Sequence, residues 1–252
     1  MNLMTETSMT ARADGNPYRY VRACAWAGPI LLFATLMFWG ILGQNVPPYS
    51  AALDAEAFAA EVRADAWLIR IGMVGQMTVS GLYLVWGIGI AKVMEAMEGD
   101  NNVLSTIQIW GAGFTVLVFE IPCMAWLAAS FRPDVMPAPI IQMLYDMGWM
   151  FFDIAYLTSL QMIPLAICIL HDRRSKPLIP KWLGWFTLWV AISFLLLILT
   201  AFFKDGPFAR TGMLNFWVEF SLFFYFWLFI AIAVIRAVGR LEREHVQRGS
   251  IG

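Results

Sequence analysis

Long apolar runs alternate with short polar segments along this chain, and that alternation dominates its predicted structure. Six runs are long enough to cross a bilayer core about 30 Å thick, which takes about 20 helical residues. They cover roughly residues 21–43, 67–93, 104–130, 139–170, 182–203 and 214–238. Because backbone groups in lipid must bond within their own segment, each run is expected to be a helix. The pattern predicts an all-α polytopic membrane protein, a bundle of about six transmembrane helices.

The polar segments set the limits of this domain, which we expect to cover 21–241 between polar tails at 1–20 and 242–252. Between the first two spans, residues 54–65 are rich in Ala and Glu. They predict a short helix that lies on the membrane surface or caps the bundle, and we favour a connector over a lid. The fourth run exceeds one span, which predicts a tilt, a kink at Pro164 or a start outside the bilayer.

Composition supports lipid as the solvent of this chain. Only 14% of its residues are charged, whereas soluble globular chains are usually about a quarter charged. The 12 Trp and 15 Met residues suit membrane interfaces and adaptable apolar packing. A net charge of −1 without a long Lys/Arg block argues against nucleic acid as a partner.

The distribution of basic residues predicts the orientation. Twelve of the 17 Lys and Arg residues fall on the side of the two termini. They are Arg12, Arg19, Arg22, Lys92, Arg173, Arg174, Lys176, Lys181, Arg236, Arg240, Arg243 and Arg248. By the positive-inside rule, both termini are expected in the cytoplasm, with the protein in the inner membrane. The first run lacks a clean cleavage site and is expected to remain as a span.

The six spans also suggest three similar hairpins. Each first helix starts near a Trp and a Gly, each outer loop carries a proline, and each second helix has a Trp followed within four residues by an ionisable side chain. Those side chains are Arg70, Asp153 and Glu219. If the hairpins are true repeats, the three groups face one shared centre. The frequency of Trp and Pro at membrane boundaries explains the same pattern without a repeat.

Charged side chains inside the hydrocarbon are costly and usually face protein or water, so they mark candidate sites. Glu120 and Asp153 are expected near mid-membrane, about 15 Å from the outer ends of their helices at 1.5 Å per residue. Asp146 lies two turns before Asp153 on the same helix face. Arg70 and Glu219 lie nearer the outer surface, where Arg70 can neutralise Asp146 or Glu219.

These positions give two sets of candidate residues. Glu120 and Asp153 are the candidate acid–base pair, because a carboxyl group kept dry holds its proton as a general acid, proton carrier or cation site requires. Glu120 also precedes Pro122, which predicts a helix bend beside a cavity. The candidate ligand-binding residues are Arg70, Asp146, Glu219, Tyr145, Trp149 and Tyr156. Interhelical hydrogen bonds that only fix the bundle, each worth about 1 kcal/mol, are the alternative.

Several chemistries are disfavoured by what the sequence offers. The only histidines, His171 and His245, are expected at cytoplasmic helix ends, whereas haem and histidine-ligated metals in bundles need several at paired spacing. We therefore predict neither a metal site nor another cofactor. Cys24, Cys123 and Cys168 lie singly in apolar runs and are expected to be buried small hydrophobes.

Three functions remain open. The first is binding or translocation of a small apolar or amphipathic molecule in an outward-opening cavity, with proton coupling through Glu120 and Asp153. The second is a cofactor-free intramembrane isomerase or hydratase acting on a lipid-like or terpenoid substrate. The third is an accessory subunit of a membrane complex. Expected partners are membrane lipid, the ligand, and a second copy of the chain or another membrane protein.

Overall fold

The computed structural model describes residues 17–99, 101–154 and 156–249, and all of its regular structure in these residues is helical. The α-helices are α1 (Arg19–Thr35), α2 (Ala55–Ser80), α3 (Leu82–Glu98), α4 (Val103–Phe131), α5 (Ala138–Ile154), α6 (Ser159–His171), α7 (Lys181–Ser193) and α8 (Glu219–Gly249). Three segments have other helical geometries: η1 (Leu36–Leu42) and η3 (Met213–Val218) are π-helical, and η2 (Phe194–Ala201) is a 3-10 helix. Most of the predicted tail 1–20 lies outside the described residues, as does the end of 242–252.

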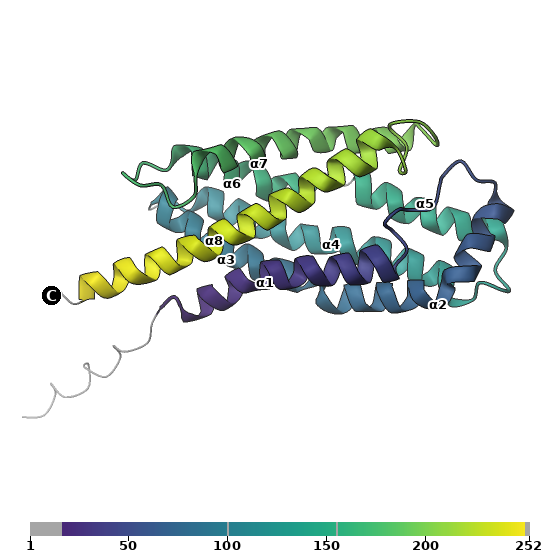
Figure 1. Ribbon diagram of the computed structural model, residues 1–252, viewed down its shortest axis with the longest axis horizontal. Helices are drawn as coiled ribbons and strands as arrows, with labels where there is room; N and C mark the ends of the chain where they lie inside the picture. Colours follow the sequence, from purple (N-terminus) through teal and green to yellow (C-terminus); the bar gives the residue numbers. More distant parts are fainter. Residues whose placement is uncertain (1–16, 100, 155, 250–252) are drawn as a thin grey trace, which may run out of the picture.

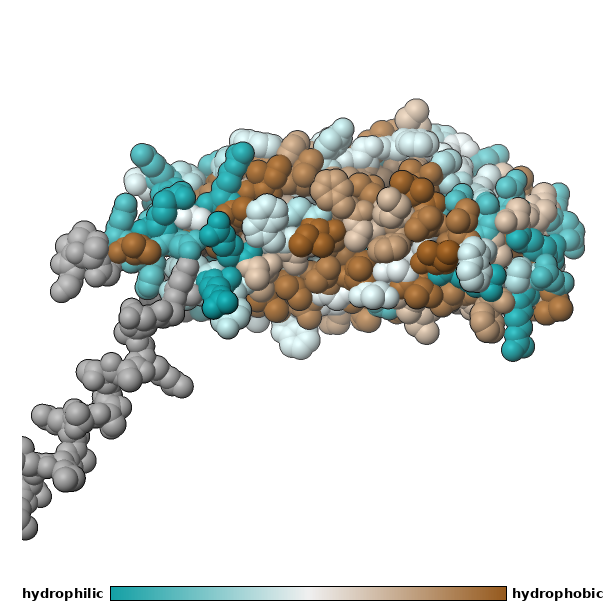
Figure 2. All heavy atoms as spheres, turned by 60° about the horizontal axis from the view of Figure 1, so that its bottom comes forward, coloured by the Kyte–Doolittle hydropathy of each residue, from teal (hydrophilic) through white to brown (hydrophobic). Residues whose placement is uncertain are grey.

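These elements form six segments long and apolar enough to cross a membrane, which confirms the predicted polytopic bundle. The segments are Arg19–Leu42, Ala55–Glu98, Val103–Phe131, Ala138–His171, Lys181–Ala201 and Met213–Arg248. Figure 2 shows an apolar band around the middle of the molecule, with hydrophilic residues gathered at both ends. Trp26, Trp110 and Trp182 are exposed on this surface, as expected for side chains that face lipid near an interface.

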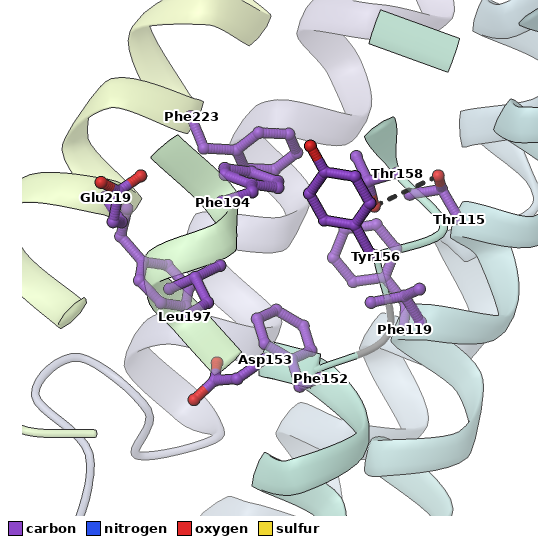
Figure 3. Close-up of a pocket in the computed structure, with 12 residues that line it drawn as sticks. Thr115, Phe119, Phe152, Asp153, Tyr156, Thr158, Phe194, Leu197, Glu219 and Phe223 are labelled. Atoms are coloured by element: carbon purple, nitrogen blue, oxygen red, sulfur yellow. Dashed lines mark hydrogen bonds between the residues drawn. The ribbon is translucent and has the colours of Figure 1, made fainter. Parts of the chain in front are cut away.

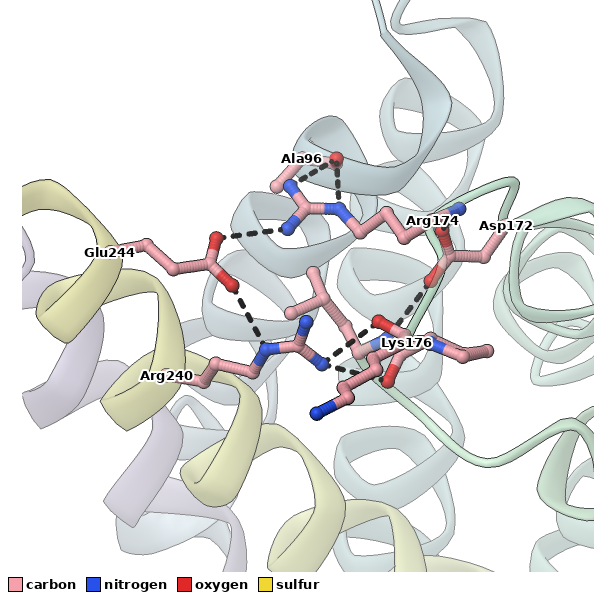
Figure 4. Close-up of polar contacts among 8 residues, drawn as sticks. Ala96, Asp172, Arg174, Lys176, Arg240 and Glu244 are labelled. Carbon is pink, nitrogen blue, oxygen red and sulfur yellow. Dashed lines mark hydrogen bonds and ion pairs between the residues drawn. The ribbon is translucent and has the colours of Figure 1, made fainter. Parts of the chain in front are cut away.

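The helices run roughly along the long axis, and α1 begins at the end of the bundle where α8 finishes (Figure 1). We call this the terminal end, and the opposite one, which carries the segments 43–54, 132–137 and 202–212, the distal end. At the terminal end, Glu244 of α8 accepts hydrogen bonds from Arg174 at 3.1 Å and Arg240 at 2.9 Å (Figure 4). Arg174 also bonds the Ala96 carbonyl, and Arg240 bonds the Lys176 carbonyl. This network ties the loop after α6 to α3 and α8.

The short separate helix predicted over residues 54–65 is not present. Asp54 caps the helix start by accepting a hydrogen bond from the Ala57 amide at 2.9 Å, but the helix continues without a break to Ser80. Phe58 and Val62 are fully buried in the bundle. The Ala/Glu-rich stretch is therefore the N-terminal part of α2, and its i, i+4 apolar pair packs into the bundle rather than on the membrane surface.

The fourth span is interrupted, but not at Pro164. Helix α5 ends at Ile154 and α6 begins at Ser159, whereas Pro164 lies inside α6. Irregular backbone at membrane depth is tolerated where it is buried in protein or lines a cavity. The 3-10 helix η2 contacts both α5 and the π-helical η3, so the regular α-helix is also abandoned in two segments packed near this interruption.

The interior consists of two aromatic-rich clusters joined near the middle of the bundle. One contains Tyr83, Trp86 and Trp227, and the other contains Trp39 and Trp126. Phe152 packs against both clusters. Its position marks the junction between the two halves of the core.

Close helix approach depends on glycine at a few points. A Cβ atom at Gly72 in α2 would lie 2.4 Å from the backbone nitrogen of Gly43. Without that atom, α2 packs directly against η1, which carries Trp39 into the core. The orientation of Trp39 matters for the site described next.

Candidate functional site

A cavity of about 40 Å³ lies where the two core clusters meet. Its walls come from α4, from the end of α5 and the α5–α6 interruption, from η2 and from the start of α8 (Figure 3). About 10 to 15 Å³ admits the centre of one water-sized sphere, so the space suits about three waters or a group of that size. The cavity therefore coincides with the interrupted spans.

Asp153 is the most isolated polar group that lines this cavity. It is the penultimate residue of α5 and is only 4% exposed. Neither carboxylate oxygen has a hydrogen-bond partner among the residues described. Thr200 and Asn215 are the potential hydrogen-bond donors beside the carboxylate, and the charge of Arg210 attracts it. A buried carboxyl group without partners is costly, which makes Asp153 a strong functional candidate.

Glu219 is the second carboxyl group in the lining. It is the first residue of α8, directly after the π-helical η3, and is 2% exposed. One of its oxygens accepts a hydrogen bond from the Ser193 hydroxyl at 2.8 Å. Like Asp153, it forms no ion pair among the described residues. Insertions of π-helix recur at functional sites because they re-aim side chains, and here one precedes Glu219.

Aromatic rings make up most of the remaining wall. Those that line the cavity are Phe119, Phe152, Tyr156, Phe194, Phe220 and Phe223. The rings of Phe152 and Phe220 stack with centroids 5.8 Å apart. Trp39 stacks on both, at 5.3 Å from Phe152 and 5.5 Å from Phe220. The rings of Trp39, Phe152 and Phe220 are therefore held in place by their mutual packing.

Hydroxyl groups complete the lining. Tyr156 lies within the interruption and donates a hydrogen bond to the Ala191 carbonyl of α7. Thr115 of α4 and Thr158 join their hydroxyls at 3.3 Å (Figure 3). These bonds connect the interrupted backbone to its neighbours, as buried polar groups in a membrane require.

A separate polar cluster closes the distal end. Arg210, from the loop between η2 and η3, is 2% exposed and donates to Asp146 and to the Tyr49 carbonyl, each at 2.7 Å. Its guanidinium also lies 5.2 Å from the Phe58 ring centroid. Burial lowers the pKa of Arg210, and the nearby Asp146 carboxylate opposes that effect. One side chain thus fastens α2, α5 and two distal loops together.

The predicted partner of Asp146 was therefore wrong. Arg70 forms no ion pair with Asp146 or Glu219 in the described part of the chain; it bonds the Ala66 carbonyl of its own helix at 3.2 Å and lies over the Trp67 ring. Both side chains reach toward the helix surface, where a long cation can extend to polar surroundings. Arg210, which lies between the predicted spans 182–203 and 214–238, supplies the charge instead.

The predicted pairing of Glu120 with Asp153 was also wrong. Glu120 does not line the cavity and accepts a hydrogen bond from Ser80 of α2. Tyr145 and Trp149 are buried in the core cluster that contains Trp39 and Trp126, and they do not line the cavity. Of the eight predicted site residues, the cavity contains three: Asp153, Tyr156 and Glu219. Of the three ionisable groups at matching positions in the suggested hairpin repeats, Asp153 and Glu219 line the same cavity, whereas Arg70 lies elsewhere.

Sequence reasoning missed several residues around the site. Thr200 and Asn215 are hydrogen-bonded to one another beside Asp153, and Ser193 holds Glu219. Each is a lone polar residue within an apolar run, which is the signal that could have identified them. No local signal marks Arg210 as buried.

The lining suits some chemistries better than others. Among the described residues, no group of three or more His, Cys, Asp or Glu side chains is arranged to hold a metal ion. Two carboxyl groups in a largely aromatic space can instead carry a proton or pair with a positive group. The fold and this cavity define a six-helix multi-pass membrane protein with an ionisable internal site. Comparisons with protein-family models, curated proteins and solved structures found no match for this chain.

Proposed function

We propose that this protein binds a small apolar or amphipathic molecule in the cavity between α4, α5, η2 and α8. The observation that carries the proposal is the lining itself, in which aromatic rings surround a few convergent polar groups. That is the usual composition of a ligand pocket. Drug-sized ligands need roughly 300 to 1,000 Å³, so a larger ligand enters with its head group alone or widens the cavity as it binds.

Access from the distal end, and movement of the ligand across the membrane, extend this proposal. Asp153 is attracted by Arg210, whose bonds to Asp146 and Tyr49 must open for a ligand to enter from that end. Interrupted helices around a midplane site are a common feature of secondary transporters. We assign proton coupling to Asp153 and Glu219 in place of Glu120. Loss of proton-linked uptake in Asp153→Asn supports the coupling, whereas unchanged uptake removes it.

Retained small molecules provide the direct test of binding. Leu197 of η2 lines the cavity, whereas Leu195 of the same segment is exposed on the outside of the bundle. Leu197→Trp should fill the cavity, and Leu195→Trp is the matched control. Mass spectrometry of purified protein should find a small molecule in wild type and Leu195→Trp that is missing from Leu197→Trp. Identical molecules in all three samples would contradict the proposal.

The placement in the inner membrane with both termini in the cytoplasm belongs to the same proposal. Its support is the excess of Lys and Arg at the terminal end. A reporter that is active only in the cytoplasm, fused after the last residue, should be active. The same reporter inserted between Lys204 and Asp205, in the distal loop, should be inactive, and the reverse pattern would invert the orientation.

An acid–base enzyme is the second candidate, because Asp153 and Glu219 line one cavity. Isomerisation or hydration of a lipid-like substrate requires a proton donor and an acceptor of this kind. A reaction rate that shows no ionisation near neutral pH would count against it. The accessory-subunit interpretation is tested by co-purification in mild detergent, where a monodisperse protein on its own would argue against it.

A further inference from the structure

The cavity contains an imbalance of charge. Asp153 and Glu219 are both almost fully buried, and neither forms an ion pair among the residues described. The charge of Arg210 acts on Asp153, but Arg210 is already bound to Asp146 and to the Tyr49 carbonyl. Carboxylates in a membrane interior are normally paired. These two are available to a positive group supplied from outside the chain.

The aromatic rings around the cavity also favour a positively charged ligand. The faces of aromatic rings carry partial negative charge and attract cations, most strongly where water is excluded. Cages of such rings are the known way for proteins to hold substituted ammonium groups. Here the rings of Phe152, Phe194 and Phe223 (Figure 3) and of Phe220, which stacks on Phe152, line the same cavity as Asp153 and Glu219.

The same lining is unsuited to an inorganic cation. Ca²⁺ and Mg²⁺ require about six or more oxygen ligands in a compact shell. The described residues contain no group of three or more acidic, His or Cys side chains placed to provide one. A substituted ammonium group needs only one or two carboxylates and apolar contact. A cavity of about 40 Å³, which suits about three waters, is too small for a whole lipid and leaves room for a small group only.

We propose that the ligand of this cavity is an organic cation, in which a small substituted ammonium group carries an apolar tail. This inference rests on the proposed function and specifies the ligand. The ammonium group contacts the aromatic wall, and the carboxyl groups of Asp153 and Glu219 balance its charge. The tail extends along the apolar surfaces of η2 and α8, where Leu197 and Phe223 line the cavity.

The test compares two probes of the same shape and different charge. Butyltrimethylammonium is a cation, and 2,2-dimethylhexane is its uncharged isostere. Binding is measured by titration calorimetry on the full-length protein in lipid nanodiscs. We expect the cation to bind at least tenfold more tightly than the isostere. This comparison uses the wild-type protein, so it does not depend on any variant folding correctly.

Variants then assign the effect to the cavity. Asp153→Asn and Glu219→Gln keep the side-chain shape and remove the charge, and each should weaken cation binding about tenfold while leaving the isostere unaffected. Glu120→Gln, whose carboxyl group lies outside the cavity and accepts from Ser80, is the matched control and should change neither.

The outcomes separate this inference from the function on which it rests. Equal binding of the two probes, or tighter binding of the isostere, overturns the organic cation and leaves a site for neutral apolar molecules. Tighter cation binding that Asp153→Asn and Glu219→Gln do not reduce overturns the assignment to this cavity. If neither probe binds, both the inference and the proposed binding function fail.

Discussion

Arg210 and Asp146, in the distal cluster, form an ion pair whose two side chains differ in burial. Removing one charge should therefore lower the unfolding free energy more than removing the other. The Arg210 side chain is 2% exposed, whereas that of Asp146 is 37% exposed. Asp146→Asn leaves a buried guanidinium without its carboxylate, and breaking a buried pair in this way costs about 3 to 5 kcal/mol. Because solvent already screens part of the Asp146 charge, we expect about 2 to 3 kcal/mol of lost unfolding free energy.

The reverse substitution should cost less. Arg210→Met keeps an apolar side chain of similar length over Phe58 and leaves Asp146 in contact with solvent. Its main loss is the bond to the Tyr49 carbonyl, worth about 1 to 2 kcal/mol for a charged donor. The double variant should lose about as much unfolding free energy as Arg210→Met alone. That loss is about 2 kcal/mol smaller than the sum of the losses in the two single variants.

The assay is denaturant unfolding in mixed micelles, followed by far-ultraviolet circular dichroism and Trp fluorescence. All four proteins of the double-mutant cycle are measured under one condition. The reasoning would be refuted if Asp146→Asn cost less than Arg210→Met, or if the double variant equalled the sum. Either result would mean that solvent reaches Arg210 and that the cluster does not seal the distal end.

Two further predictions concern stability elsewhere in the bundle. Gly72→Ala should lower the unfolding free energy by about 1 to 3 kcal/mol, because its Cβ would lie 2.4 Å from the Gly43 nitrogen. At Gly81 a Cβ would meet no atom within 4 Å, so Gly81→Ala should leave the unfolding free energy unchanged or raise it by up to about 1 kcal/mol. Equal effects of the two substitutions would contradict this packing. Glu244→Gln should lower the unfolding free energy by about 1 kcal/mol, because it weakens the contacts with Arg174 and Arg240. This loss should shrink in high salt. Glu95→Gln, which removes only the contact with Lys92, should lower the unfolding free energy by less than half as much.

The positions of the spans were predictable because they depend on a local property. Any run of about 20 apolar residues is more stable in lipid as a helix, whatever its neighbours are. The approximate depth of each charge followed from the fixed rise of a helix, which is why Asp153 was recognised as a membrane-level carboxyl group. The hydropathy pattern was less reliable at helix ends, and it missed the continuity of residues 54–65 with α2.

The membership of the site was not predictable in the same way. Depth along a helix says nothing about rotation around it or about which helices are neighbours. Glu120 and Asp153 lie at similar expected depths, yet one faces Ser80 and the other a cavity with Glu219. The interruption between α5 and α6 likewise depends on neighbouring spans, because the carbonyl of Ala191 in α7 accepts a hydrogen bond from Tyr156.

The sequence by itself determined that the protein is a six-span helical bundle with charges at membrane depth, because hydropathy and helical rise act within each segment. The tertiary structure alone decided which charges meet. Arg210 reaches Asp146 across 64 positions of the chain, and Asp153 joins Glu219 through helix packing and the π-helical turn of η3. Such contacts depend on the relative rotation of packed helices, and no single segment encodes that rotation.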